Sequence, residues 1–190
     1  TTEIYTVYKS SAASDVYKRQ KPGPGLRICP RRCNHLQDTC GRHLSKRGLE
    51  AAGTGRSKGG LTTKIHAAVD ALGLPIRTAI TPGQWGDSPQ ARGLIEGLRG
   101  VSHGIMDAAC DADHLRAFIA DDLGATAHIK RNPTRCEGRY IDWVLYKERH
   151  LVECFFNRIK RFRRIALRCE KTVESFKAFV DLACAMAWIG

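Results

Sequence analysis

The stretch YKERHLVECFFNRIK, residues 146–160, carries four chemically different side chains at the spacing Y-x2-R-x3-E-x6-K. Because an α-helix advances about 100° per residue, Arg149, Glu153 and Lys160 fall at about −60°, −20° and −40° from Tyr146. The apolar side chains fall between about 140° and 240°. These apolar side chains are Leu151, Val152, Phe155, Ile159 and Phe162. The pattern predicts a helix that buries one face and presents a carboxylate among cations on another.

A solvated helix with ordinary ion pairs is the usual interpretation of a run of charges. The four-residue spacing is too particular for that, and it resembles the C-terminal signature of insertion-sequence transposases of the DDE type. Other segments of that family follow in the same order along the chain. They are GRSKGGLTTKIHAAVDALGLPIR at 55–77, TPGQ at 81–84 followed by Asp87-Ser88, and the segment that contains Asp107. The resemblance covers roughly residues 50–190.

The resemblance implies an α/β fold over residues 51–190: an RNase H-like core, with a mixed sheet flanked by helices, incomplete at its N-terminal side. It also implies that Asp107 and Glu153 are the second and third of three catalytic carboxylates that bind metal. Two departures from the family are Cys110, where an aromatic residue is usual, and Gly86, where His is frequent. We expect Cys110 to loosen the packing beneath the site.

DNA cleavage and strand transfer are in-line displacements at phosphorus, which two divalent metals about 3.5–4 Å apart can promote. Mg²⁺ or Mn²⁺ requires oxygen ligands, so carboxylates serve in such a site. Asp107 follows an apolar segment, 103–106, that reads as a strand, and open α/β sheets bind ligands at such strand ends. An Asp at that place can also merely cap or turn the chain, and only tertiary packing can bring Asp107 to Glu153.

The same resemblance implies that Arg149 and Lys160 face the DNA backbone. Tyr146 is expected to bond a phosphate, to orient the Glu, or to pack as an aromatic edge beside the site. A basic loop at 130–135 and a basic segment at 161–168 add further DNA-binding candidates. These are Arg131, Arg163 and Arg164, with Arg168 continuing the charge.

The family's first carboxylate lies on a strand before the one predicted at 61–69, in a D-S/T segment. Asp38-Thr39 is the one remnant of that shape, and it stands too close to the GRSKGG segment. We therefore expect the first acid to be missing. Without it, this chain is expected to bind DNA weakly and to cleave it poorly or not at all.

Residues 1–50 do not read like the rest of the chain. DVYKRQ, residues 15–20, resembles one translated frame of a sequencing adapter, so residues 1–20 are interpreted as not natural protein. Residues 21–45 are interpreted as read out of frame, and the whole segment 1–50 as artefactual or disordered. One alternative is a non-catalytic, zinc-dependent nucleic-acid module at 29–43. Its candidate ligands are Cys29, Cys33, His35, Cys40 and His43.

The chain is strongly basic, with a net charge of +12 from 31 Lys and Arg against 19 Asp and Glu. Residues 147–171 contain nine Lys or Arg and three Asp or Glu, so half of the excess (9 − 3 = +6) surrounds the motif. Such a field favours a polyanion, because neutralised phosphates release counterions. The expected partner is DNA, both the transposon terminal inverted repeats and the target. A homodimer is one possible oligomeric state. An RNase H-like nuclease without joining activity is the alternative function for the same fold.

No membrane partner is expected, because the longest apolar run, 183–189, is too short to cross a bilayer. The resemblance and the scattered cysteines, read as reduced thiols, indicate a bacterial cytoplasmic protein associated with the nucleoid. Hydrophobic patterning predicts the secondary structure of the second half. It gives strands at 61–69, 74–80, 103–107 and 125–130, a turn at 70–73 opened by Asp70, and helices at 112–123 and 172–189.

Overall fold

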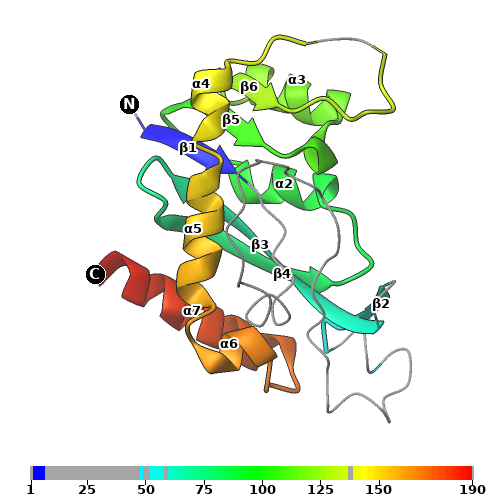
Figure 1. Ribbon diagram of the computed structural model, residues 1–190, viewed down its shortest axis with the longest axis vertical. Helices are drawn as coiled ribbons and strands as arrows, with labels where there is room; N and C mark the ends of the chain where they lie inside the picture. The colour runs from blue at the N-terminus through cyan, green and yellow to red at the C-terminus, as the bar shows by residue number, and fades with distance from the viewer. Residues whose placement is uncertain (1, 7–47, 49–51, 58–59, 137–138, 190) are drawn as a thin grey trace, which may run out of the picture.

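The computed structural model describes residues 2–6, 48, 52–57, 60–136 and 139–189. These residues form a six-stranded mixed sheet in the order β2-β3-β1-β5-β6, with β4 paired to the long strand β3 (Figure 1). The strands are β1 (Thr2–Thr6), β2 (Gly55–Ser57), β3 (Gly60–Asp70), β4 (Pro75–Pro82), β5 (Val101–Met106) and β6 (Thr126–Ile129). β1 lies antiparallel to β3 and parallel to β5, and β5 is parallel to β6. The expected mixed α/β architecture is confirmed.

Helices cover both faces of this sheet (Figure 1). They are α2 (Ser88–Ile95), the short 3-10 helix η3 (Ala108–Cys110), α3 (Asp113–Asp121), α4 (Trp143–Lys147), α5 (His150–Ile159), α6 (Arg163–Leu167) and α7 (Val173–Ile189). Side chains on a strand alternate between faces. Ile65 and Val69 therefore pack against α5 and α7, whereas Ala68 packs against α2 and α3. The sheet separates two apolar cores.

The hairpin of β3 and β4 forms where turn residues interrupt two apolar segments. The Asp70 carboxylate accepts hydrogen bonds from the backbone N–H groups of Leu72 at 2.9 Å and Leu74 at 2.8 Å. Gly73 adopts a positive φ of 74°, which glycine reaches without a steric penalty. The interpretation of Asp70 as the residue that opens the turn is confirmed.

The segment containing the Y-R-E-K spacing forms two consecutive helices rather than one. α4 ends at Lys147 and α5 begins at His150, while Glu148 and Arg149 keep right-handed helical angles between them. The buried face of α5 contains Phe156, which the predicted apolar stripe omitted. Phe156 falls at about 280° from Tyr146, beside Arg149 at about 300°, so the core reaches the edge of the charged stripe.

Two helices, α2 and α6, were not anticipated from the sequence. α2 begins after Asp87, with Pro89 in its first turn. Proline has no backbone N–H, and this costs nothing there because the N–H groups of a first turn have no acceptor within the helix. The sequence Asp87-Ser88-Pro89 therefore carried a start signal that was overlooked. The last helix, α7, begins as expected after Thr172, whose hydroxyl accepts from the Ser175 N–H at 3.3 Å.

Arg168 is the clearest structural correction to the sequence interpretation. It ends α6 with a φ of 36° and is only 4% exposed, so it does not extend the basic surface. Its guanidinium donates to the Thr54 hydroxyl at 2.8 Å, to the Gly53 carbonyl at 3.3 Å, and to the Thr63 hydroxyl and the Ala52 carbonyl. Arg168 therefore joins residues 52–54 to β3 from inside the protein.

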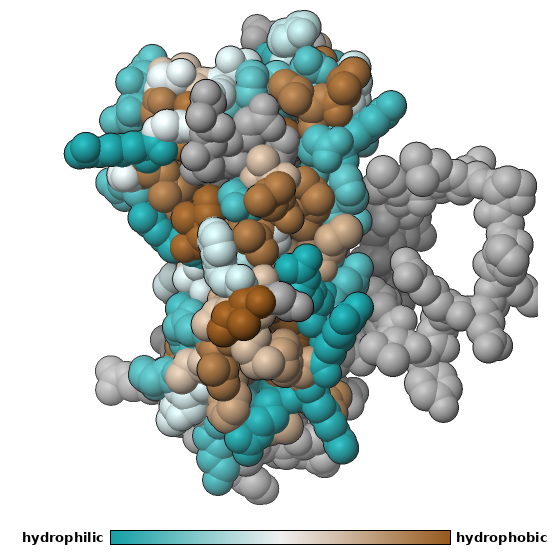
Figure 2. Space-filling view, turned by 90° about the vertical axis from the view of Figure 1, so that its left-hand side faces the viewer, coloured by the Kyte–Doolittle hydropathy of each residue, from teal (hydrophilic) through white to brown (hydrophobic). Residues whose placement is uncertain are grey.

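Several large apolar side chains remain on the surface of the part that the structure describes. Trp143 and Val144 on α4 are 59% and 73% exposed, and Leu72 in the hairpin turn is 74% exposed. On the face shown in Figure 2, hydrophobic patches alternate with hydrophilic side chains along the length of the molecule. Single exposed apolar residues are common in soluble domains and carry no functional conclusion by themselves.

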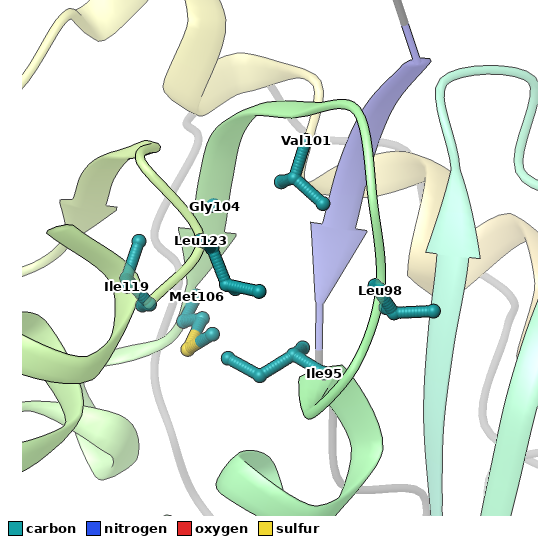
Figure 3. A pocket seen from close by; sticks show the side chains of 7 residues that line it. All are labelled: Ile95, Leu98, Val101, Gly104, Met106, Ile119 and Leu123. Atoms are coloured by element: carbon teal, nitrogen blue, oxygen red, sulfur yellow. The ribbon is translucent and has the colours of Figure 1, made fainter. Parts of the chain in front are cut away.

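A small apolar pocket lies between β5, α2 and α3 (Figure 3). Its lining consists of Ile95, Leu98, Val101, Gly104, Met106, Ile119 and Leu123. Gly104 leaves part of this space open because it has no side chain. A Cβ atom added there would lie 3.4 Å from the nearest carbon of Ile119, which is ordinary van der Waals contact.

We expect Gly104→Ala to raise the free energy of unfolding by about 0.5–1 kcal/mol, measured by urea denaturation. The added methyl group restricts the unfolded chain and packs against Ile119. Gly104→Val serves as the comparison, because its two further methyl groups exceed the space and should reverse the gain. A destabilised Gly104→Ala protein would contradict this description of the pocket.

Candidate active site

Asp107 lies directly after β5, at the edge of the sheet where the parallel strands β5 and β6 end. Its carboxylate accepts a hydrogen bond from the Ala108 N–H at 2.7 Å and caps η3. The residue is partly exposed to solvent. Asp107 therefore does cap the chain, which was the alternative to a role in metal binding. This hydrogen bond uses only one of the acceptor positions of the carboxylate.

Glu153 projects from α5 and forms an ion pair with Arg149, one helical turn earlier. The Arg149 Nη2 to Glu153 Oε1 distance is 2.8 Å, with side-chain exposures of 11% and 41%. Burial lowers the pKa of Arg149, but Glu153, Tyr146 and Asp107 together raise it above its ordinary value. Both predicted carboxylates therefore lie within electrostatic range of the same guanidinium, which stays charged.

Tyr146 belongs to this cluster as well. Burial raises the pKa of its phenol to about 12; Arg149 acts against that shift, and Asp107 adds to it. Its ring meets Trp143 edge-on, with centroids 5.7 Å apart. Tyr146 therefore remains protonated at neutral pH. Its ring packs against Trp143, and its hydroxyl lies in the electrostatic field of Arg149. The structure thus groups Tyr146, Arg149 and Glu153, with Asp107 within electrostatic range of Tyr146 and Arg149.

A buried ion pair beside this cluster was missed in the sequence. Lys64 on β3 lies 3.2 Å from the Asp87 carboxylate, and their side chains are 8% and 11% exposed. Lys64 also donates to the Trp85 carbonyl, and His66 Nδ1 lies 3.9 Å from Asp87. The signal was available: Lys64 and His66 are two residues apart on one strand, and so lie on the same face of it.

Cys110 lies close to both Asp87 of the ion pair and Asp107. Burial, followed by the negative charges of Asp87 and Asp107, raises the pKa of the Cys110 thiol to about 12. The thiol is 1% exposed and packs in the core between the sheet, α2 and α3. It fills the position beneath the site as a small apolar side chain and is not a nucleophile at neutral pH.

The remaining basic candidates are spread along the molecule. Lys160 ends α5, about 10 Å along the helix axis from Glu153. Arg163 and Arg164 lie on α6, at the end of α5 away from α4 (Figure 1). Arg164 stacks over the Phe179 ring at 4.6 Å and lies 3.5 Å from Glu170. Arg131 is exposed after β6, and its Nη1 donates to the Cys136 carbonyl at 3.3 Å.

The described residues include two of the three carboxylates that the resemblance assigns to a metal site. Asp107 and Glu153 supply the hard oxygen donors that Mg²⁺ or Mn²⁺ prefers, and both are accessible. Within the described ranges, no group of three or more His, Cys, Asp or Glu side chains is placed to hold a metal ion. Asp38-Thr39, the remnant suggested for the first acid, and the cysteine and histidine cluster at 29–43 lie outside those ranges.

A histidine pair supports the start of α4. His103 Nδ1 and His128 Nε2 are 3.2 Å apart, and His128 Nδ1 accepts the Asp142 N–H at 3.2 Å. Asp142 in turn caps α4 by accepting from Val144 and Leu145. Because His128 accepts at Nδ1, it must be neutral, with its proton on Nε2. Burial, and then His103, lowers the pKa of His128.

The free energy of unfolding is therefore expected to fall as the pH is lowered. The His128 pKa is lower in the folded than in the unfolded protein, so its contribution is complete above about pH 6.5 and is lost as the pH falls through the folded value. His128→Gln should flatten this acid slope in urea titrations. His150→Gln, at an exposed position on α5, should leave the slope unchanged. Equal slopes in all three proteins would show that another group dominates.

Fold and site together define an α/β protein with an acidic site bordered by cations, and comparison with known proteins identifies the family. The profile of the family described as "Transposase DDE domain" matches residues 26–188. The chain is also 66% identical, over 129 residues, to a Brucella ovis protein named "Putative transposase for insertion sequence element IS6501". That alignment spans 68% of this chain and 99% of the relative. No solved structure matches the chain.

The chain therefore belongs to the DDE transposase family, as the Y-R-E-K spacing predicted. It is an enzyme by class, a catalytic domain of DNA transposition, and domains of this family act on DNA with divalent metal ions. Within the residues that the structure describes, every helix is too short or too polar to span a bilayer.

Proposed function

We propose that this chain carries out metal-dependent DNA cleavage and strand transfer with Asp107 and Glu153 as metal ligands. The observation that carries the proposal is the ion pair of Arg149 and Glu153 at 2.8 Å, with Asp107 close enough to act electrostatically on the same guanidinium. A strand-end acid and a helix acid, 46 positions apart in the sequence (153 − 107), thus approach the same cation. This juxtaposition is what a site assembled from both acids requires.

The strand order supports an RNase H-like core. β4, β3 and β1 are joined antiparallel, and β5 and β6 continue the sheet in parallel. Asp107 follows the strand next to β1, at the edge where α/β sheets bind ligands. Glu153 reaches the same region from the helix that packs across this face of the sheet.

Divalent Mg²⁺ or Mn²⁺ bound at these oxygens would activate the attacking oxygen and stabilise the leaving one. The chain's own residues position the DNA. Arg149 holds Glu153 through a charge-assisted bond and keeps its charge, so it can also face a phosphate. We assign backbone contacts to Tyr146, Lys160, Arg131, Arg163 and Arg164, which follow the length of α4, α5 and α6 and the loop after β6. The ends of the element and a target duplex are the proposed substrates.

The test is a Mn²⁺-dependent cleavage assay on duplexes that carry the ends of the element, with nicked and joined products resolved on gels. We expect slow nicking or none by these 190 residues, because a site with two carboxylates holds metal more weakly than one with three. Any nicking must disappear in Asp107→Asn and in Glu153→Gln. Vigorous strand transfer would contradict the expected weakness, and nicking that survives both substitutions would overturn the assigned site.

A further inference from the structure

Two arginines in the loop after β6 converge on a single exposed carboxylate. Arg135 Nη1 and Arg139 Nη2 each lie 2.7 Å from Asp113 Oδ1. The side chains of Asp113, Arg139 and Arg135 are 62%, 40% and 34% exposed, so the group is open to solvent. The hydrogen bond from Arg135 lowers the pKa of Asp113, which is therefore ionised at neutral pH.

A buried carboxylate holds one side of this group in place. Asp111, 2% exposed, lies 2.9 Å from Arg116 and accepts the Asn132 N–H at 2.8 Å. Its second oxygen also lies 3.7 Å from Arg135. Arg116 donates in turn to the Ile129 carbonyl at the end of β6 at 2.8 Å. The loop is thus attached to α3 and to the sheet, and Arg135 is preorganised rather than freely mobile.

The position of the group places it beside the candidate active site. Met106 pairs with Ile129, so Asp107 and Lys130 occupy neighbouring strand ends. Asp113 begins α3, three residues after the end of η3, which Asp107 caps. Asp113, Arg135 and Arg139 therefore lie on the edge of the sheet that carries the catalytic carboxylate.

We propose that Arg135 and Arg139 form a phosphate-binding subsite that Asp113 occupies in the free protein and vacates when a phosphodiester binds. This inference rests on the proposed function only for its ligand, DNA. One Asp113 oxygen receives both arginines, whereas a phosphodiester offers two non-bridging oxygens, one for each guanidinium. With Asp111 and Arg116 included, three cations face two anions, which leaves a net charge of 3 − 2 = +1 for an incoming anion.

The exchange is physically reasonable because exposed ion pairs are weak. An accessible Asp–Arg pair gains little over hydration and is screened by salt, so a competing anion can replace it. A DNA phosphate brings the additional gain of counterion release. Asp113 would then keep the two guanidiniums positioned in the absence of DNA and lower the affinity for non-cognate anions.

The first arm of the test uses inorganic phosphate as the probe in low-salt buffer. Binding is followed through the side-chain Nε–H NMR signals of Arg135 and Arg139. Asp113→Asn should bind phosphate about threefold to tenfold more tightly than the unmodified chain, since the competing charge is gone. Asp121→Asn makes the same charge change at the other end of α3 and should bind like the unmodified chain. Equal gains in both variants, or no gain in Asp113→Asn, would overturn the proposal.

The second arm measures binding to a short duplex as a function of salt. Arg139→Gln should weaken binding and reduce the slope of log K against log[salt] by about 0.9, the value for one lost phosphate contact. Arg99→Gln, an equal charge change before the opposite end of β5, should reduce the slope less. Equal slope changes would overturn the DNA part of the proposal. If the unmodified chain binds no duplex, the proposed function fails, while the phosphate arm still decides the subsite.

Discussion

Replacing Arg168 with alanine is expected to lower the free energy of unfolding by about 3–5 kcal/mol. The guanidinium donates to two backbone carbonyls, at Ala52 and Gly53, and to two hydroxyls, at Thr54 and Thr63, and lies 5.2 Å from the Phe176 ring. Truncation removes the buried charged donor that these four groups share, leaves the two carbonyls only their bonds from the Thr54 and Thr63 hydroxyls, and opens a space beside Phe176. Against a total stability of about 5–15 kcal/mol, that loss is a large fraction. Urea denaturation followed by far-UV circular dichroism measures it.

A second substitution separates the side chain from the backbone. Arg168 has a φ of 36°, in the region where an L-residue other than glycine costs about 1–2 kcal/mol. Arg168→Gly loses the same hydrogen bonds but relieves this strain, so it should destabilise the protein less than Arg168→Ala. Arg163→Ala, on the exposed face of α6, should change stability by less than about 0.5 kcal/mol. A tolerated Arg168→Ala would refute the internal role of this arginine.

The sequence predicted most of the elements for local reasons. β3, β4, β5 and β6 stand where alternating or continuous apolar runs met turn residues, and Asp70 and Gly73 close the hairpin through contacts within five residues. The two helices that were overlooked, α2 and α6, are short, with eight and five residues. Patterning is weakest in such segments, because a single turn or two gives little periodicity.

What the sequence could not predict depends on contacts between distant segments. Arg168 looks like any other cation of a basic stretch, and only the approach of residues 52–54 turns it into a buried donor. The sequence places Lys64 on a strand but does not reveal its ion pair with Asp87, which forms only when the start of α2 packs against β3. For the site, the family spacing named Arg149 and Glu153, which form an ion pair, while the catalytic role of Asp107 and Glu153 stays a prediction. Their meeting itself follows from packing α5 across the sheet, which no local pattern encodes.

The second large effect concerns metal binding. Asp107→Asn and Glu153→Gln are each expected to weaken Mn²⁺ binding at least about tenfold, because an amide keeps the oxygen but loses the charge that a hard cation requires. Both replacements keep an acceptor for the observed hydrogen bonds, from Ala108 and from Arg149, so the fold should be retained. Electron paramagnetic resonance of free Mn²⁺ gives the dissociation constants. Glu174→Gln, on the exposed side of α7, is the matched control.

The same variants test the geometry without any metal. Asp107 contributes to the raised pKa of Tyr146, which stands at about 12. Removing that negative charge in Asp107→Asn should lower the pKa of Tyr146, as followed by the NMR signals of its ring, whereas Asp121→Asn should not. If the Tyr146 pKa falls and Mn²⁺ binding is unchanged, Asp107 lies beside the helix but binds no metal. If neither changes, the two acids do not share a site, and the proposed chemistry has no centre in this chain.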